Sequence, residues 1–313
     1  MSGTKFKAIW SGRTDSEEAE ELATRLHQVI VPFSRGEEGL AIVGFCSDEG
    51  VSRNKGRKGA RNAPDQLRRA LANLPWSSNR QAYDAGNIIC EDDQLEQAHE
   101  DLANRVSDCL AGGHFTFVLG GGHEVAYGNW LGLVQHFESQ ESVPLIGIIN
   151  FDAHFDLRLD RNGCSSGTPF YQIAKQCEQK KYPFKYSCFG VSEVANSLAL
   201  FNRADLLGVS YRKDSDMGVT ALDEITNQLE QFIDDCDVLY LTIDLDVLPA
   251  SEAPGVSAPA SRGVGLEVLE PLIETIKSSG KLKLADIAEY NPVFDIDNRT
   301  ARVAARLFYN IVK

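Results

Sequence analysis

The sequence predicts an α/β protein of three layers, in which a mostly parallel β-sheet lies between two layers of helices. Short apolar runs, typical of strands that are buried on both faces, recur along the 313 residues. Segments with apolar residues at helical spacing separate these runs, so strand and helix alternate. No internal repeat and no long Pro/Gly/Ser-rich linker divides the chain. We therefore expect a single αβα domain over residues 1–313, with a flanking helical segment at 1–38.

Each expected element follows from its local pattern. The expected strands are the apolar runs Leu40–Phe45, Phe115–Leu119, Leu145–Phe151, Tyr186–Val191, Val238–Asp244 and Leu284–Ala288. The expected helices between them are Ala63–Leu74, Gln94–Leu110, Glu124–His136, Thr168–Gln179, Thr220–Ile233 and Leu266–Ile276. Ser16–Ile30 and Asn298–Val312 have the same spacing and should form flanking helices, the second with Asn298 as its N-cap.

Charge and composition exclude several classes of protein. The 31 Lys and Arg residues against 45 Asp and Glu residues leave a formal net charge of −14, which disfavours nucleic acids and anionic membranes as partners. No run of 18 apolar residues occurs in the sequence, and we expect no secretory signal. The seven cysteines are scattered without C-x-x-C spacing, so we expect reduced thiols, neither disulfides nor a thiolate zinc site, and a cytoplasmic location.

Polar groups follow three of the expected strands. In an open parallel sheet, ligands bind at the carboxyl ends of the strands. Gly120-Gly121-Gly122-His123-Glu124 follows the second strand. By itself this motif is weak evidence, because strand-to-helix turns often need glycine and a single histidine usually packs in the core.

The other two strand ends carry more ligand-type residues. Asp152, His154 and Asp156 alternate with apolar residues after one strand, so an extended chain would project all three to one side. Asp244 and Asp246 share one side after another strand. Carboxylates gathered in a buried setting need a compensating cation.

The charge of these side chains indicates which cation. Four carboxylates bring −4 and two neutral imidazoles bring none, so two divalent ions would balance the six ligands. An oxygen-rich set with two imidazoles suits Mn²⁺ better than Zn²⁺. A pair of metal ions activates water for hydrolysis, but these residues alone leave open whether a phosphoryl group, an amide or an amidine is attacked. The six expected ligands are His123, Asp152, His154, Asp156, Asp244 and Asp246.

The three motifs together resemble those of the ureohydrolases, the arginase and agmatinase family. Their order and spacing agree, and further matches are Gly56-Arg57 with Gly59-Ala60, Ser257-Ala258-Pro259, and Asp286-Ile287-Ala288-Glu289-Tyr290-Asn291-Pro292. The resemblance extends from about Gly39 to the C-terminus and implies an arginase-like fold with two Mn²⁺ ions per subunit. Related enzymes form trimers or hexamers, so a homo-oligomer is expected.

The resemblance also implies a role for each site residue. Asp152 and Asp244 would bridge the two ions, His123 and Asp156 would complete one ion, and His154 and Asp246 the other. A metal-bridging hydroxide would attack the substrate carbon, and Asp156 would also pass a proton to the leaving amine. Glu289 would pair with the amidinium or guanidinium group of the substrate.

Departures from the arginase pattern indicate the substrate. Arg158 stands where arginases carry an asparagine, and Phe170 where they carry a histidine. Both changes resemble formimidoylglutamases, which cleave N-formimino-L-glutamate to L-glutamate and formamide in histidine degradation. The dianionic substrate suits Arg158, which binds carboxylate bidentately, whereas agmatine would be repelled.

Further substrate contacts are expected from Ser166 and Thr168, and Arg57, Arg61 and Arg161 are candidates for the second carboxylate. The alternative function is that of another ureohydrolase, an arginase, agmatinase or guanidino-acid hydrolase, which would keep the metal site and release urea. A dinuclear phosphoesterase is less favoured, because it would give the Glu289 motif no role and usually needs more histidine ligands than this chain offers.

Overall fold

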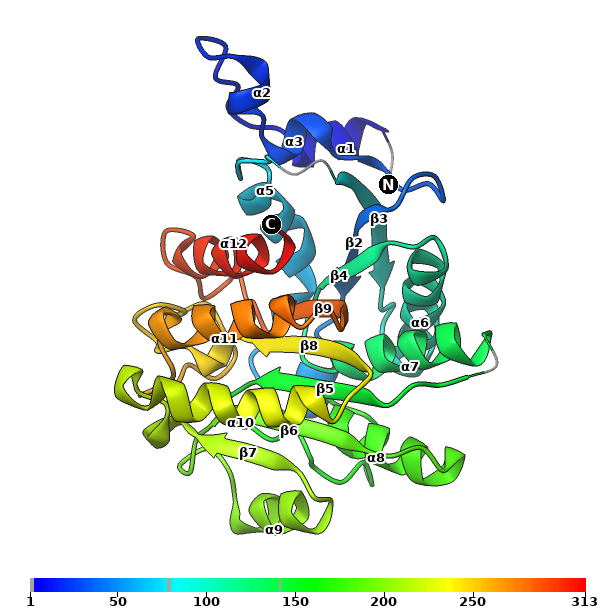
Figure 1. The fold of residues 1–313 in the computed structure, drawn as a ribbon, viewed down its shortest axis with the longest axis vertical. Coiled ribbons are helices and arrows are strands. Elements are labelled where there is room, and N and C mark those ends of the chain that lie inside the picture. Colours follow the sequence, from blue (N-terminus) through cyan, green and yellow to red (C-terminus); the bar gives the residue numbers. More distant parts are fainter. Residues whose placement is uncertain (1–2, 78–79, 141) are drawn as a thin grey trace.

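Nine parallel strands form one twisted sheet at the centre of the molecule (Figure 1). The structure is a computed structural model that describes residues 3–77, 80–140 and 142–313. The strands lie in the order β1-β3-β2-β4-β9-β8-β5-β6-β7, and every pairing between them is parallel. The α/β prediction is thereby confirmed. Their bounds are β1 Val31–Pro32, β2 Gly39–Cys46, β3 Gln81–Ile89, β4 Phe115–Leu119, β5 Ile146–Phe151, β6 Lys185–Val191, β7 Ser210–Lys213, β8 Val238–Asp244 and β9 Leu282–Ala288.

Helices cover both faces of the sheet, as the three-layer prediction requires. Their bounds are α1 Gly3–Ile9, α2 Glu20–Ala23, α3 Leu26–Val29, α4 Glu49–Arg53, α5 Ala63–Leu71, α6 Leu95–Ala111, α7 Val125–Glu138, α8 Pro169–Lys180, α9 Leu198–Leu206, α10 Leu222–Asp234, α11 Leu266–Ser278 and α12 Arg299–Val312. Figure 1 shows α11 and α12 on one side of the strands and α6 and α7 on the other.

Alternate residues of the central strands feed two apolar cores. Leu40 and Ile42 of β2 pack into the core under α5, α10, α11 and α12, whereas Ala41 and Val43 pack into the core under α6, α7 and α8. Burial on both faces is why these strands are continuous apolar runs and could be recognised in the sequence. None of the helices in the described ranges is both long and apolar enough to cross a lipid bilayer.

The expected helix at Ser16–Ile30 is wrong. The chain there forms two short helices, α2 and α3, separated by extended residues Thr24 and Arg25. Arg25 pairs with Pro75 in an isolated bridge, and its guanidinium bonds to Asp15 and to the carbonyl of Asn73. These tertiary bonds stabilise an extended backbone that local helical spacing does not reveal.

Three strands were not expected from the sequence: β1 and β7 at the two edges of the sheet, and β3 next to β1. Strand β3 contains Asp84 in a buried position, where the side chains of Arg68 and Trp10 donate to it. Strand β7 is half-buried along its whole length. Both lack the continuous apolar run by which the other strands were recognised.

Helix α12 begins where expected, but Asn298 does not cap it. Asn298 has a positive φ of 53° and makes no capping hydrogen bond through its side chain. The carboxylate of Asp295 accepts the backbone N–H groups of Thr300 and Ala301 instead. Asp295 therefore satisfies the N-terminal amides of this helix.

Whether the chain is one domain stays a prediction.

Candidate metal centre and pocket

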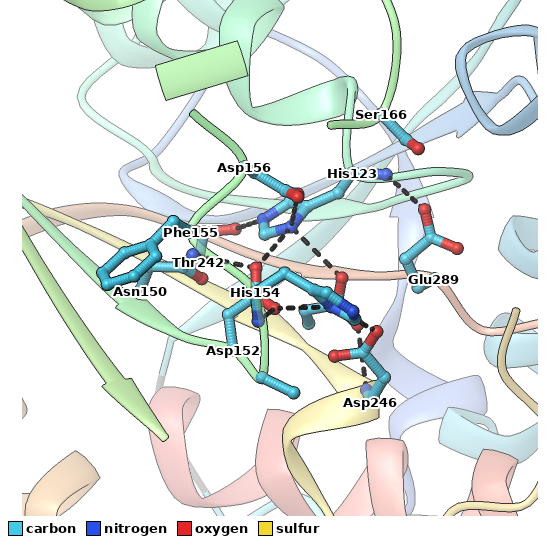
Figure 2. A network of polar contacts seen from close by, with 12 residues as sticks. His123, Asn150, Asp152, His154, Phe155, Asp156, Ser166, Thr242, Asp246 and Glu289 are labelled. Carbon is cyan, nitrogen blue, oxygen red and sulfur yellow. Dashed lines mark hydrogen bonds and ion pairs between the residues drawn. The ribbon is translucent and has the colours of Figure 1, made fainter. Parts of the chain in front are cut away.

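Six side chains meet at the carboxyl ends of three strands, β4, β8 and β5. Figure 2 labels His123, Asp152, His154, Asp156 and Asp246 among them, together with Glu289, which follows β9. One group brings together four ligand-type residues, His123, Asp152, Asp156 and Asp244, and a second group joins Asp152 to His154 and Asp246. Nδ1 of His123 lies 3.0 Å from carboxylate oxygens of Asp152 and Asp156 and 3.2 Å from one of Asp244. The six residues expected to bind metal thus lie together, with Asp152 common to both groups.

The second group has a similar geometry. Nδ1 of His154 lies 3.1 Å from Oδ2 of Asp246 and 3.5 Å from Oδ1 of Asp152. All of these side chains are buried except those of His154 and Asp156, which are partly exposed. A ligand from solvent can therefore reach the cluster past His154 and Asp156, one from each group.

Turns, not extended strands, bring the paired ligands together. The expected extended chain through Asp156 is wrong, because β5 ends at Phe151 and Asp156 has a positive φ of 48°. The carboxylate of Asp152 accepts the backbone N–H of His154 at 2.6 Å, and that of Asp244 accepts the N–H of Asp246 at 2.9 Å. The same turn, in which an aspartate bonds the amide two residues on, therefore positions a ligand pair twice.

A buried hydrogen-bond chain orients His123. Its Nε2 lies 3.0 Å from the hydroxyl of Thr242, and that hydroxyl donates to Oδ1 of Asp286 at 2.7 Å. Because the Asp286 carboxylate only accepts, the Thr242 oxygen must accept the Nε2 proton of His123. This fixes the tautomer in which Nδ1 carries a lone pair, and it is Nδ1 that faces the three carboxylates.

The site fits a pair of divalent cations. Nδ1 of His123, Oδ1 of Asp246 and Oε2 of Glu289 are buried and have no hydrogen-bond partner within the described ranges. Burial raises the pKa of Asp244 well above its ordinary value, and the charges of Asp246 and Asp152 add to this. Four carboxylates and two imidazoles crowded in this way favour a bound cation over separate charges.

Glu289 lies beside the cluster, immediately after β9. Its backbone has a φ of 64°, and its Oε1 accepts the N–H of His123 at 2.9 Å. Burial raises the pKa of Glu289 to about 8, and the nearby charge of Glu124 contributes. The free Oε2 faces no protein donor among the described residues, so it is available to a ligand.

One cavity, which we call the central pocket, opens onto the cluster. It has a volume of about 320 Å³. Its lining includes His154, Asp156, Asp244, Asp246 and Glu289, together with Asn54, Lys55, Arg57, Arg158, Ser166, Asn196 and Leu200. Carboxylates and cations therefore line the same pocket.

Some of the residues expected to contact substrate line the central pocket and others do not. Arg158 and Ser166 line the central pocket, and the Ser166 hydroxyl accepts from Asn54 at 3.3 Å. Thr168 does not line it, and its hydroxyl bonds Ser165 and Gln172 within the same segment. A direct contact of Thr168 with substrate stays a prediction, while its bonds are those of a residue that holds the Ser165–Ser166 turn.

The other candidate arginines also differ in whether they line the central pocket. Arg61 and Arg161 do not line the central pocket. Arg57 lines it, but its guanidinium donates to the carbonyls of Val256 and Ser257 and lies 3.8 Å over the ring of Phe294. Arg57 is therefore held by the protein itself.

Four residues near the site were not assigned a role from the sequence. Thr242 and Asp286 lie within apolar strands, where a buried polar side chain needs a hydrogen-bond partner. A polar residue inside an apolar run is visible in the sequence, so these two residues could have been singled out. Glu124 accepts from Ser47 and from the amide of Gly50, which ties α4 to the site. Lys55 has no local sequence signal, because only the fold brings it to the pocket.

Comparison with known proteins agrees with the geometry. A family model described as the arginase family matches residues 38–313. The chain is 55% identical over 309 residues to a formimidoylglutamase of Aeromonas hydrophila, an alignment that covers 98% of this chain and 97% of that relative. A formimidoylglutamase of Hahella chejuensis is 51% identical over 308 residues, covering 98% of this chain and 94% of the relative.

A solved structure is similar over nearly the same extent. That of Trypanosoma cruzi formiminoglutamase with Mn²⁺₂ superposes with a TM-score of 0.81 at 27% identity, and covers 92% of this chain and 97% of its own. The family match spans most of the sequence, and the relatives named above share more than half of their aligned residues with it. The chain therefore belongs to the arginase family.

Proposed function

We propose that the protein hydrolyses N-formimino-L-glutamate to L-glutamate and formamide with two Mn²⁺ ions bound at the six-residue cluster. The observation that carries this proposal is that acidic and basic side chains line the same central pocket. Asp156 and Glu289 lie on its lining beside the metal cluster, and Arg158 lies on the same lining. A substrate that carries both an amidine and carboxylates matches a pocket lined by both kinds of charge. The high identity to formimidoylglutamases over almost the whole chain supports the same substrate.

The six ligands would divide between the two ions. His123 and Asp156 would help to hold one ion and His154 and Asp246 the other, while Asp152 and Asp244 would contribute to holding both. Asp152 has one oxygen near each histidine, Oδ2 near His123 and Oδ1 near His154, so it belongs to both groups of ligands. When bound, two such ions lower the pKa of water and supply hydroxide at neutral pH.

The side chains around the ions have three tasks. Glu289 holds the amidine nitrogen through Oε2, since its Oε1 is occupied by the amide of His123. Asp156, partly exposed to the pocket, passes a proton to the departing α-amine. Arg158 binds a substrate carboxylate. Water adds to the formimino carbon, the bond from that carbon to the α-nitrogen breaks, and formamide and L-glutamate result.

The alternative within the family is a ureohydrolase that acts on arginine, agmatine or a guanidino acid. A single assay panel separates the two. The protein loaded with Mn²⁺ is incubated with formiminoglutamate, arginine, agmatine and guanidinobutyrate, and both formamide and urea are measured. Formamide from formiminoglutamate alone is the expected result, and urea from any of the other three would overturn it.

A cytoplasmic location, a homo-oligomeric state and a single catalytic domain accompany this function as proposals. Size-exclusion chromatography with light scattering tests the oligomeric state. A monomer at micromolar concentration would contradict it.

A further inference from the structure

Two cations on the lining of the central pocket have side chains that the protein itself does not hold. Lys55 and Arg158 are exposed, and neither side chain makes a hydrogen bond or an ion pair within residues 3–77, 80–140 and 142–313. Both also line an adjoining cavity of about 590 Å³, the side cavity, so they lie where the two cavities meet. An anion in the central pocket would meet both of them.

The remaining arginines around these cavities are already bonded. Arg57 is held by two carbonyls and by Phe294. Arg53 of the side cavity pairs with Glu49 and Glu96. Arg203 donates to the carbonyl of Leu157. Lys55 and Arg158 are consequently the cations that remain to bind an anionic ligand.

The backbone at Lys55 is held in a conformation that lysine rarely adopts. Helix α4 ends in a Schellman motif, in which the N–H of Gly56 bonds the carbonyl of Val51 at 2.8 Å and that of Lys55 bonds the carbonyl of Ser52 at 2.9 Å. The motif sets φ of Lys55 to 64°, at the position where glycine is usual. A lysine here therefore lowers stability relative to glycine, and its side chain must serve something other than the turn.

Two other non-glycine residues with positive φ line the same pocket. They are Asp156 and Glu289, the two residues proposed to contact the reacting group. Unfavourable backbone conformations gather at functional sites, where the side chain must be presented in one direction. Lys55 shares with these two residues both the strained backbone and the place on the pocket wall.

We propose that Lys55 binds one carboxylate of the substrate while Arg158 binds the other, so that the pair selects dicarboxylates. This inference rests on the proposed function, because it assigns the two acidic groups of formiminoglutamate. Glu289 and Asp156 then face the amidine end, and the two cations face the acid end. A substrate with a cationic tail would meet Lys55 and Arg158 with like charge, and one with a single carboxylate would leave one of them unused.

The test uses Lys55→Gly, because glycine keeps the turn and removes only the side chain. Steady-state kinetics of the Mn²⁺-loaded enzyme should show a KM for formiminoglutamate raised at least tenfold, with kcat changed less than threefold. Lys55→Arg should restore most of the lost affinity. The matched control is Lys58→Ala, an exposed cation three residues on that lines neither cavity, and its KM should stay within twofold of wild type.

Two further readouts separate binding from folding and from turnover. The thermal midpoint of Lys55→Gly should equal or exceed that of wild type, since the turn favours glycine. Calorimetric binding of glutarate, a dicarboxylate without a formimino group, should weaken at least tenfold in Lys55→Gly. N-formiminoglycine has only one carboxylate. With this substrate, one of the two substitutions, Lys55→Gly or Arg158→Ala, should no longer raise KM.

The outcomes distinguish the two claims. If wild type releases formamide but Lys55→Gly has the KM and the glutarate affinity of Lys58→Ala, the role of Lys55 is wrong and the proposed function stands. If wild type releases no formamide from formiminoglutamate, the proposed function is wrong. In that event the glutarate affinity of Lys55→Gly still tests the proposed dicarboxylate site. An unchanged affinity would show that Lys55 does not bind a carboxylate, and an affinity at least tenfold weaker would support that it does.

Discussion

Replacing Thr242 by valine should weaken metal binding without touching any metal ligand. The substitution keeps the shape of the side chain and removes the hydroxyl between His123 and Asp286. Two buried groups then lose a partner, the Nε2 proton of His123 at 3.0 Å and Oδ1 of Asp286 at 2.7 Å. Asp286 keeps its bonds from Tyr240 and Asn129, so its other oxygen remains paired.

The size of the effect follows from these two bonds. A buried polar group left unpaired costs about 1–3 kcal/mol, so the free energy of unfolding of the metal-free protein should fall by about 2 kcal/mol or more. Loss of the group that orients a ligating histidine typically lowers metal affinity by about 10–100-fold. That factor corresponds to about 1.4–2.7 kcal/mol of binding free energy.

The assay is a titration of the metal-free protein with Mn²⁺, followed by calorimetry, beside urea denaturation of the same samples. Thr116→Val is the matched control, because Thr116 is equally buried in β4, which β9 separates from β8. Its hydroxyl lies 3.5 Å from the carbonyl of His114 and does not bond His123. Thr242→Ser should bind Mn²⁺ within threefold of wild type. Equal Mn²⁺ affinity in Thr242→Val and Thr116→Val would refute the role assigned to Thr242.

Three further predictions concern binding, pH and stability. Arg158→Ala should raise KM for formiminoglutamate at least tenfold in steady-state kinetics, and an unchanged kcat/KM would remove Arg158 from the substrate site. Burial lowers the pKa of His99 to about 4 from an ordinary 6.5. Between these two pH values the unfolded chain binds more protons than the folded protein. Lowering the pH from 6.5 to 4 should therefore reduce the free energy of unfolding by up to about 3 kcal/mol. His99→Phe should remove that slope in urea denaturation, and an identical pH dependence would contradict the argument. Asp84→Ala deprives the fully buried Arg68 of its nearer carboxylate partner at 2.8 Å, so the free energy of unfolding should fall by about 3 kcal/mol. A fall below about 1 kcal/mol would show that Asp65, Asn87 and the carbonyl of Gly86 suffice to pair Arg68.

Continuous apolar runs and ligand spacing were the parts of this molecule that the sequence could predict. Strands such as β5 and β8 are buried on both faces, so their burial appears directly as apolar residues. The clustering of Asp152, His154 and Asp156 was also predictable, although the geometry assumed for it was wrong. Any local arrangement that satisfies the carboxylates must bring them to a common cation, whether the chain is extended or turned.

Other features depend on contacts between distant segments. Strand β3 is stabilised by bonds of Asp84 to Arg68 and Trp10, which lie far from it in the sequence. Lys55 reaches the pocket through the end of α4, and nothing around it in the sequence distinguishes it from a surface lysine. Arg57 was a reasonable candidate for the substrate until the structure placed its guanidinium on two carbonyls.

The central claim is that six side chains hold two metal ions that together make the site active. Anomalous diffraction from crystals soaked in Mn²⁺, recorded near the manganese absorption edge, tests it most directly. Two peaks are expected, one among His123, Asp152, Asp156 and Asp244, and one beside His154 and Asp246. Asp246→Ala should keep the first peak, lose the second and lose nearly all turnover. A single peak in the wild type, or full activity of Asp246→Ala with one ion, would contradict the account.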